Sequence, residues 1–215
     1  MQETHIETPK TARYFTLGNL SEKTKNVWIV CHGYGQLANY FLKKFEVLEN
    51  DETVIIAPEG LHRFYWEKFT GKVVASWMTK EDRENDIKDY VRFLDTVLEN
   101  VIKQCNGKLP KITVLGFSQG TATVCRWILQ GKIKPNHLIL WAGAFPHDIN
   151  FEVKQEQFSN FKTWLVLGDE DPFMEYIKIE EYKTLLEKNK FDYEFISFKG
   201  KHDIDSGTLQ LLIEN

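Results

Sequence analysis

Short apolar runs alternate with longer amphipathic stretches along most of the chain. The runs lie at residues 27–31, 54–57, 112–115, 138–141, 164–167 and 193–198. Near-continuous apolar runs of this length are typical of parallel strands that are buried on both faces of a sheet. Residues 14–17, paired with a segment before them, are expected to form an antiparallel strand at the edge.

The stretches between the runs have helical periodicity. In residues 82–105 the apolar positions recur with a period near 3.6 and form one stripe made of Ile87, Val91, Leu94, Leu98, Val101 and Cys105. Helices are also expected at residues 37–48, 121–130, 175–188 and 208–213. Strands that alternate with helices predict βαβ units, and therefore an α/β fold with a mostly parallel sheet and helices on both faces.

One segment does not follow this alternation. Residues 60–80 join the run at 54–57 to the long helix, and they are rich in aromatic side chains. A connection of this length in a compact domain is often functional. Two interpretations stay open, namely a pocket wall or flap, and a loop that packs its aromatic side chains against the edge of the sheet.

Length and composition narrow the class of protein. The chain has 215 residues, of which 42% are hydrophobic, so one domain over residues 1–215 is expected. A net charge of −4 gives no reason to expect a nucleic acid or an anionic membrane as partner. No apolar run is long enough to span a membrane, and no signal peptide is evident at the N-terminus. The sequence does not indicate an oligomeric state.

Three cysteines, which cannot all pair with one another, indicate free thiols and a reducing compartment. Cytoplasmic localisation is therefore expected.

The chemistry centres on Gly116-Phe117-Ser118-Gln119-Gly120, which has the G-x-S-x-G pattern of a nucleophile elbow. The pattern is short, but an apolar run leads directly into it and a helical pattern leads directly out. The turn between them must be tight, and the two glycines keep side chains from colliding there. Ser118 is thus predicted to be a nucleophile. The alternative is an ordinary serine that caps the helix.

A serine hydroxyl needs a base to remove its proton, and in this fold the acid and then the histidine follow the serine along the chain. His147 and His202 are the downstream histidines in plausible loops. His202 follows the last apolar run, and ligands of open α/β sheets bind at the carboxyl ends of the strands. His202 is therefore the predicted base, against the alternative of a surface histidine in a polar turn.

The acid that orients the histidine is expected after the run at residues 164–167. Asp171 is favoured because the proline that follows it restricts its backbone, and Asp169 stays open as the second choice. Asp203 and Asp205 follow the histidine along the chain and are weak candidates.

An acyl-transfer site also needs N–H donors for the oxyanion of the tetrahedral intermediate. The backbone N–H of Gln119, directly after the nucleophile, is the first expected donor. The second is the N–H of Tyr34 in His32-Gly33-Tyr34-Gly35, the loop that follows the first apolar run. His32 itself is expected to make structural hydrogen bonds within this loop.

These segments together resemble the phospholipase/carboxylesterase family, which includes acyl-protein thioesterases and small bacterial carboxylesterases. The resemblance rests on the order, spacing and content of Cys31-His32-Gly33-Tyr34-Gly35, Gly116-Phe117-Ser118-Gln119-Gly120, Gly168-Asp169-Glu170-Asp171-Pro172 and His202. It implies an α/β-hydrolase fold without a large cap domain, and hydrolysis of carboxylic esters or thioesters without a metal or cofactor. It also implies that the acid is Asp171, the aspartate before the proline.

The chain departs from the family pattern at two places. Thr121 stands where members usually have a further glycine. Leu167 replaces a histidine, and Phe173-Met174-Glu175 stands where members often have another proline. The second departure borders the expected pocket, so protein depalmitoylation is not carried over to this chain.

The predicted activity is that of a serine carboxylesterase acting on a small-molecule ester. Thioester or other acyl hydrolysis on the same triad is the alternative, and a non-catalytic binding module is a further one. Four aromatic residues are predicted to form an apolar acyl pocket with Tyr34: Phe64, Tyr65, Trp77 and Phe145. Arg63 is expected to be solvated or to pair within its loop, with contact to an anionic substrate group as the alternative.

Overall fold

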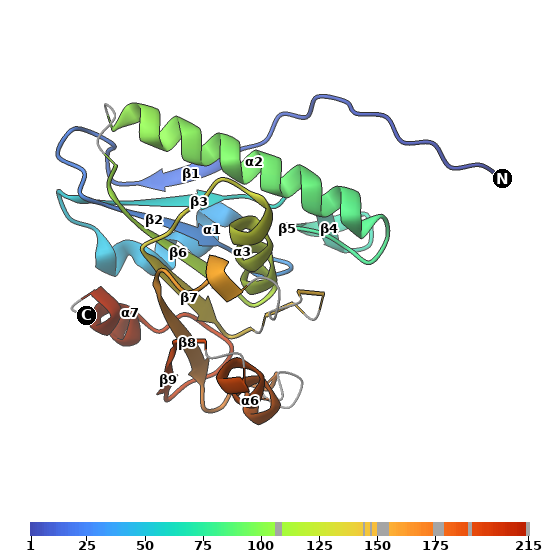
Figure 1. Cartoon of the computed structure of the whole chain (residues 1–215). Coiled ribbons are helices and arrows are strands. Elements are labelled where there is room, and N and C mark those ends of the chain that lie inside the picture. Colours follow the sequence, from blue (N-terminus) through green and yellow to red (C-terminus); the bar gives the residue numbers. More distant parts are fainter. Residues whose placement is uncertain are drawn as a thin grey trace.

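A seven-stranded sheet lies at the centre of the computed structural model, which describes residues 1–105, 109–143, 145–146, 148–149, 155–173, 179–188 and 191–213 (Figure 1). In spatial order the strands are β1 (Tyr14–Leu17), β3 (Thr53–Pro58), β2 (Asn26–Cys31), β6 (Lys111–Phe117), β7 (His137–Trp141), β8 (Lys162–Gly168) and β9 (Glu194–Phe198). The strand β1 is antiparallel to β3, and all the other pairs are parallel. The predicted mostly parallel sheet is confirmed.

The strands agree with the apolar runs, with two differences. The strands β2, β3, β6, β7 and β8 are buried along almost their whole length, but β9 is largely exposed because it lies at the edge of the sheet. The prediction of an antiparallel edge at β1 is confirmed, but its expected partner was wrong. The strand pairs with β3, which follows it in the chain.

Helices cover both faces of the sheet, as predicted (Figure 1). One face carries α2 (Arg83–Gln104), α3 (Gln119–Gln130) and α6 (Ile179–Lys188). The other face carries α1 (Ala38–Leu42), the 3-10 helix η1 (Lys43–Leu48) and α7 (Ser206–Ile213). A short 3-10 helix, η2 (Gln155–Gln157), precedes β8. A helix is expected at residues 175–188, and its first part, residues 175–178, lies outside the described residues.

Each face has its own apolar core. The predicted stripe, except for Cys105 just beyond the end of α2, packs against one face of the sheet together with Val114, Val124 and Trp127. On the other face, Phe41, Phe45 and Leu209 pack against Trp141 and its neighbours. The sheet is thereby covered by packed side chains on both faces.

Residues 60–80, for which the sequence leaves a pocket wall or flap and a packed loop open, form regular structure. They contain an antiparallel hairpin of β4 (His62–Glu67) and β5 (Thr70–Ser76), which lies beside the main sheet at the right of Figure 1. Three aromatic side chains are half or more exposed on it, namely Tyr65, Trp66 and Phe69. The end of β5 contacts the loop after β2 through an isolated bridge between Ala75 and Gln36.

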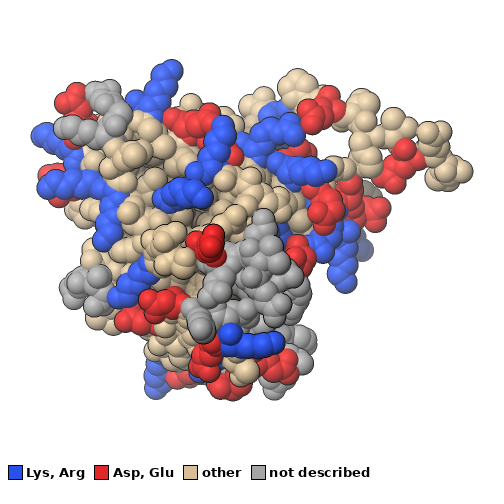
Figure 2. All heavy atoms as spheres, in the orientation of Figure 1, with Lys and Arg blue, Asp and Glu red and all other residues tan. Residues whose placement is uncertain are grey.

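The surface carries both signs of charge. Basic and acidic side chains are interspersed over the face shown in Figure 2. In the described part of the chain, no helix combines the length and the apolar character needed to cross a bilayer.

Candidate active site

Ser118 lies on the turn between β6 and α3, in a backbone conformation that is rare for a residue with a side chain. Its φ is 53° and its ψ is −115°. A non-glycine residue at positive φ costs free energy and persists only where its surroundings hold it there. The N–H of Ser118 donates to the Trp141 carbonyl at 2.9 Å. Its side chain makes no capping hydrogen bond to α3, in contrast to the capping alternative.

The glycines on either side of the turn are required by close backbone approaches. A Cβ on Gly116 would lie 2.4 Å from the carbonyl oxygen of Gly120. A Cβ on Gly120 would lie 2.2 Å from the carbonyl oxygen of Cys31, at the end of the neighbouring strand. A side chain at Gly120 would force the elbow away from β2, and one at Gly116 would force the end of β6 and the start of α3 apart. The two glycines therefore keep the turn tight against the sheet.

Thr121 is one of the departures from the family pattern, and its contacts show how the elbow accommodates a side chain at this position. Its hydroxyl donates to the Ser118 carbonyl at 2.7 Å, and its N–H lies 3.0 Å from the same oxygen. A Cβ on Gly143, after β7, would lie 2.4 Å from the Thr121 hydroxyl oxygen. The added side chain therefore fills space against a glycine and gives the elbow a second hydrogen bond.

The structure brings His202 and Asp171 together, as the sequence analysis predicted. His202 Nδ1 lies 2.7 Å from Asp171 Oδ2, and the Asp171 side chain is fully buried. The other carboxylate oxygen of Asp171 accepts the N–H of Phe173 at 2.8 Å. Both oxygens are thus engaged, which fixes the carboxylate and the histidine ring that it contacts.

The competing acids have other partners. Asp169 accepts the N–H of Gly200 at 2.9 Å and so holds the loop that carries the histidine. Asp203 pairs with Lys44, and Asp205 accepts the N–H of Thr208 at the start of α7. The alternative histidine, His147, lies outside the described residues.

Two aromatic rings contact the imidazole of His202. The centroid of Phe117 lies 4.9 Å from that of the imidazole, and the centroid of Phe173 lies 4.6 Å from it. Because Phe117 directly precedes Ser118, its contact places the imidazole beside the elbow. The second ring was not anticipated as part of the site, although the sequence marks Phe173 as a departure from the family pattern.

The loop after β2 is held by His32, which is buried and makes the structural hydrogen bonds expected of it. Its Nδ1 lies 2.7 Å from the Gly33 carbonyl, and its Nε2 accepts the N–H of Gly60 at 2.9 Å. Burial lowers the pKa of His32 to about 4, although the Gly33 carbonyl opposes that shift. The ring is therefore neutral near pH 7, as its acceptor role at Nε2 requires.

Tyr34 lies in the same loop, and its side chain is 51% exposed. The N–H of the preceding glycine, Gly33, donates to the Gln36 side chain at 2.8 Å. A Cβ on Gly33 would lie 3.1 Å from Ser118 Cβ, so this loop passes directly beside the elbow. The structure thus brings the two segments expected to supply oxyanion donors into contact.

The residues predicted for the acyl pocket divide into two pairs. Phe64 and Tyr65 lie on the hairpin, where the ring centroids of Phe64 and Tyr34 are 5.5 Å apart. Trp77 and Phe145 are buried in the core on the α2 face, so in this conformation they do not line an open pocket.

Phe145 packs edge-on against Phe158 and Phe191, which accounts for its burial. Arg63 pairs with Glu59 at 3.4 Å, which agrees with the expected pairing within its loop.

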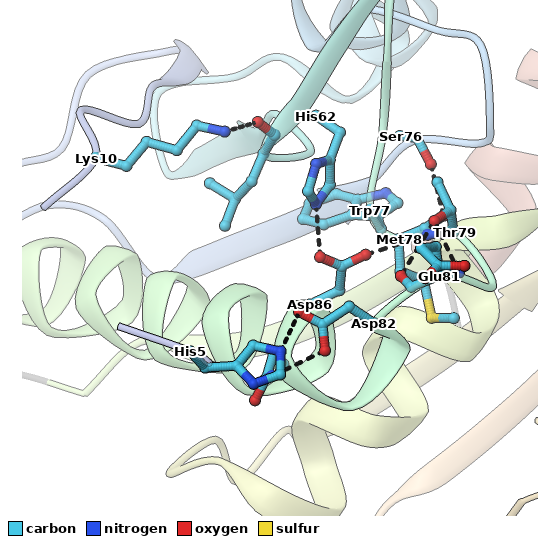
Figure 3. Close-up of polar contacts among 12 residues, drawn as sticks. His5, Lys10, His62, Ser76, Trp77, Met78, Thr79, Glu81, Asp82 and Asp86 are labelled. Atoms are coloured by element: carbon cyan, nitrogen blue, oxygen red, sulfur yellow. Dashed lines mark hydrogen bonds and ion pairs between the residues drawn. The ribbon is translucent and has the colours of Figure 1, made fainter. Parts of the chain in front are cut away.

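One cluster of side chains that carry metal-ligand atoms lies outside this site. Among the described residues, Glu3, His5 and Asp82 bring three potential ligand atoms within 4.8 Å of one another, and all three are exposed. Figure 3 shows His5 against Asp82 at the start of α2. These contacts connect the N-terminal segment to the start of α2.

Comparison with known proteins identifies the family. The profile described as phospholipase/carboxylesterase matches residues 13–215. No curated protein sequence matches the chain significantly.

Solved structures share the fold at low sequence identity. The acyl-protein thioesterase 2 of Zea mays is 15% identical with a TM-score of 0.69, and the match covers 95% of this chain and 97% of that one. A carboxylesterase of Bacillus cereus is 15% identical with a TM-score of 0.67, over 94% and 92% of the two chains. A phospholipase/carboxylesterase of Dyadobacter fermentans is 19% identical with a TM-score of 0.66, over 97% and 98%. With the profile match over nearly its whole length, the chain belongs to the phospholipase/carboxylesterase family of α/β-hydrolases.

Proposed function

We propose that this protein is a serine hydrolase that cleaves carboxylic esters through Ser118, His202 and Asp171. The observation that carries the proposal is the 2.7 Å contact between His202 and the buried carboxylate of Asp171, at a histidine whose ring packs on the residue before Ser118. A buried carboxylate that orients a histidine beside a serine on a strained turn is the arrangement that serine acyl transfer requires.

In the proposed mechanism, His202 Nε2 takes the proton of Ser118 as its Oγ bonds to the ester carbonyl carbon. The backbone N–H groups of Tyr34 and Gln119 donate to the resulting oxyanion. The carbonyl then reforms, the bond to the leaving alcohol breaks, and His202 returns the proton to that alcohol.

Water releases the acyl group in the second half of the cycle. His202 takes a proton from the water as its oxygen attacks the acyl carbon, and the bond to Ser118 breaks. The same proton then returns to Ser118 Oγ, and the acid leaves. Throughout, Asp171 accepts the hydrogen bond from Nδ1 and stabilises the imidazolium without taking its proton.

A fluorophosphonate probe tests the nucleophile directly, because it labels a serine only when a base activates it. We expect stoichiometric labelling of Ser118 in the folded protein, and no labelling of Ser118→Ala. Absence of label on the folded wild-type protein would exclude the proposed mechanism.

Thioester hydrolysis is a second candidate, since the site stabilises the same tetrahedral intermediate from either substrate and one structural neighbour is described as an acyl-protein thioesterase. A matched series of oxygen esters and thioesters with the same acyl groups separates the two activities. A higher kcat/KM for the oxygen ester at each chain length supports the carboxylesterase assignment, and the reverse order supports a thioesterase.

The three cysteines are free and buried, and this agrees with residence in a reducing compartment. We therefore propose cytoplasmic localisation, which cell fractionation with an antibody to the chain tests.

A further inference from the structure

We propose that the side chain of Gln119 is a positioning group that sets the spacing between the two oxyanion donors. This inference rests on the proposed function, because the donors act only if Ser118 attacks an acyl carbon. Gln119 thereby has two separate tasks, since its backbone N–H is a donor and its carboxamide holds the partner segment in place.

The carboxamide of Gln119 is fully engaged with the end of β5. Its Oε1 accepts the backbone N–H of Trp77 at 3.1 Å. Its Nε2 donates to the Met78 carbonyl at 2.9 Å and to the Ser76 hydroxyl at 3.1 Å. An amide is the one side-chain group of this length that can both accept from an N–H and donate to a carbonyl in this way.

The end of β5 in turn holds the loop that carries Tyr34. The indole N–H of Trp77 donates to the His32 carbonyl at 2.8 Å, and the two rings pack with centroids 5.1 Å apart. The N–H of Gly35 donates to the Ala75 carbonyl at 3.0 Å, one residue after Tyr34. A continuous set of hydrogen bonds thus runs from Gln119 through residues 75–78 to both sides of Tyr34.

The same segment is fixed on its other side by α2. The N–H of Thr79 donates to Asp86 Oδ2 at 3.2 Å, and Asp86 Oδ1 lies 3.0 Å from His62 at the start of β4. Figure 3 shows the stretch from Ser76 to Thr79 beside Asp86 and His62. Residues 76–79 therefore have fixed anchors, and the carboxamide of Gln119 is the contact that connects them to the elbow.

This arrangement matters most in the transition state. Oxyanion donors act on the charge that develops there, and a displacement of about 1 Å can cost about a hundredfold in rate. Loss of the carboxamide frees the Tyr34 loop to shift relative to the N–H of residue 119. We therefore expect kcat to fall about ten- to a hundredfold, with little change in KM.

The test compares Gln119→Ala and Gln119→Glu with the wild-type protein, and uses Gln130→Ala at the other end of α3 as the matched control. The glutamate has nearly the same size, but it cannot donate to the Met78 carbonyl. Three quantities are measured for each variant: kcat and KM with a short-chain ester, affinity for a trifluoromethyl ketone, and melting temperature. The ketone forms an oxyanion on Ser118, so its affinity reports on the donors independently of turnover.

Support for the proposal is a fall in kcat and in ketone affinity by the same factor in both Gln119 variants, with KM within about twofold. Trp77→Phe, which removes the indole N–H, should lower both quantities as well, and the double variant with Gln119→Ala should lose little more than the worse single variant. Unchanged ketone affinity in folded Gln119 variants overturns the proposal, whatever happens to stability.

The proposed function fails separately, through undiminished turnover by Ser118→Ala. If Gln119→Ala does not fold, the nearly isosteric glutamate variant and Trp77→Phe decide the question in the same way.

Discussion

At the scale of single residues, the hydrogen bonds of two neighbouring aspartates assign them different tasks. Asp171 is buried against His202, whereas Asp169 is exposed and holds Gly200 in the loop before the histidine. Spacing along the chain could not separate them, because they lie two residues apart after the same strand. What separates them is the direction of each side chain, and that is set by contacts with a loop about thirty residues further along.

The two aspartates lead to a matched prediction. Asp171→Asn should lower kcat by about three to four orders of magnitude, because the amide favours the wrong tautomer of His202. Asp169→Asn should lower kcat by less than about tenfold, since its oxygen can still accept from Gly200. Steady-state kinetics on both variants check this, and a larger loss in Asp169→Asn would reverse the assignment.

A buried histidine leads to a prediction about pH. The pKa of His32 is about 4 in the folded protein, against an ordinary value of 6.5. Between these values the unfolded chain binds a proton that the folded chain does not bind. The free energy of unfolding should therefore fall as the pH is lowered through this range, by up to about 3 kcal/mol from this residue.

Urea unfolding at a series of pH values, on the wild-type protein and on His32→Gln, measures this contribution. The glutamine keeps an acceptor for Gly60 but does not titrate, so the pH dependence should become shallower. Burial and two nearby lysines also lower the pKa of His137 to about 4. The pH dependence of His137→Gln is therefore measured beside that of His32→Gln. Equal pH dependence in the wild-type protein and His32→Gln would contradict the assignment.

The limits of sequence reasoning at this scale are visible in the aromatic residues. Position along the chain groups Phe64, Tyr65, Trp77 and Phe145 as one predicted pocket. The structure divides them between the hairpin and the core. An aromatic side chain suits a core and a pocket equally well, so residue type alone could not distinguish them.

At the scale of elements, the buried strands were predictable and the hairpin was not. Strands covered on both faces give continuous apolar runs, and the first five of the six runs each lie within an observed strand, while the run at 193–198 begins one residue before β9. The hairpin has the burial pattern of a half-exposed element, and its pairing shifts between Tyr65 and Glu67. That irregularity and the exposed aromatic side chains remove the alternation by which a strand is normally recognised.

The packing of the hairpin on the Tyr34 loop leads to a prediction about Gly35. Its φ is +74°, and a Cβ there would lie 2.3 Å from the ring of Trp66. Gly35→Ala should therefore displace either the hairpin or the loop, lowering kcat by about tenfold and also lowering the melting temperature.

A second substitution separates the two causes. Trp66→Ala in the Gly35→Ala background removes the collision but leaves the backbone strain, so it should restore part of the lost activity. Trp66→Ala alone is the control. If the double variant is no more active than Gly35→Ala, the collision with Trp66 is not the cause of the loss.

At the scale of the whole molecule, an ion-pair network connects three segments around the elbow. Arg126 on α3 is nearly buried and donates to both oxygens of Asp148, at 2.8 Å and 3.2 Å. Asp148 follows β7, and it also accepts from Arg83 on α2 at 2.8 Å. Burial alone would raise the pKa of Asp148, but the Arg126 guanidinium lowers it below its ordinary 3.8. The carboxylate is therefore charged at neutral pH and holds α3 against α2 and the loop after β7.

Arg126 is buried and Arg83 is partly exposed. Breaking their ion pairs with Asp148 should therefore lower the free energy of unfolding by unequal amounts. Asp148→Ala leaves the Arg126 guanidinium buried without a carboxylate, which should lower the free energy of unfolding by roughly 2–3 kcal/mol. Arg83→Ala removes a partly exposed partner, and it should cost less than about 1 kcal/mol. Replacing both partners, in Arg126→Met with Asp148→Ala, should recover part of the loss because no buried unpaired charge remains. Urea unfolding of the four proteins measures these differences. If Asp148→Ala costs no more than Arg83→Ala, the network does not hold α3 in place, and the elbow is then held by its glycine contacts and by the hydrogen bonds of Ser118 and Thr121.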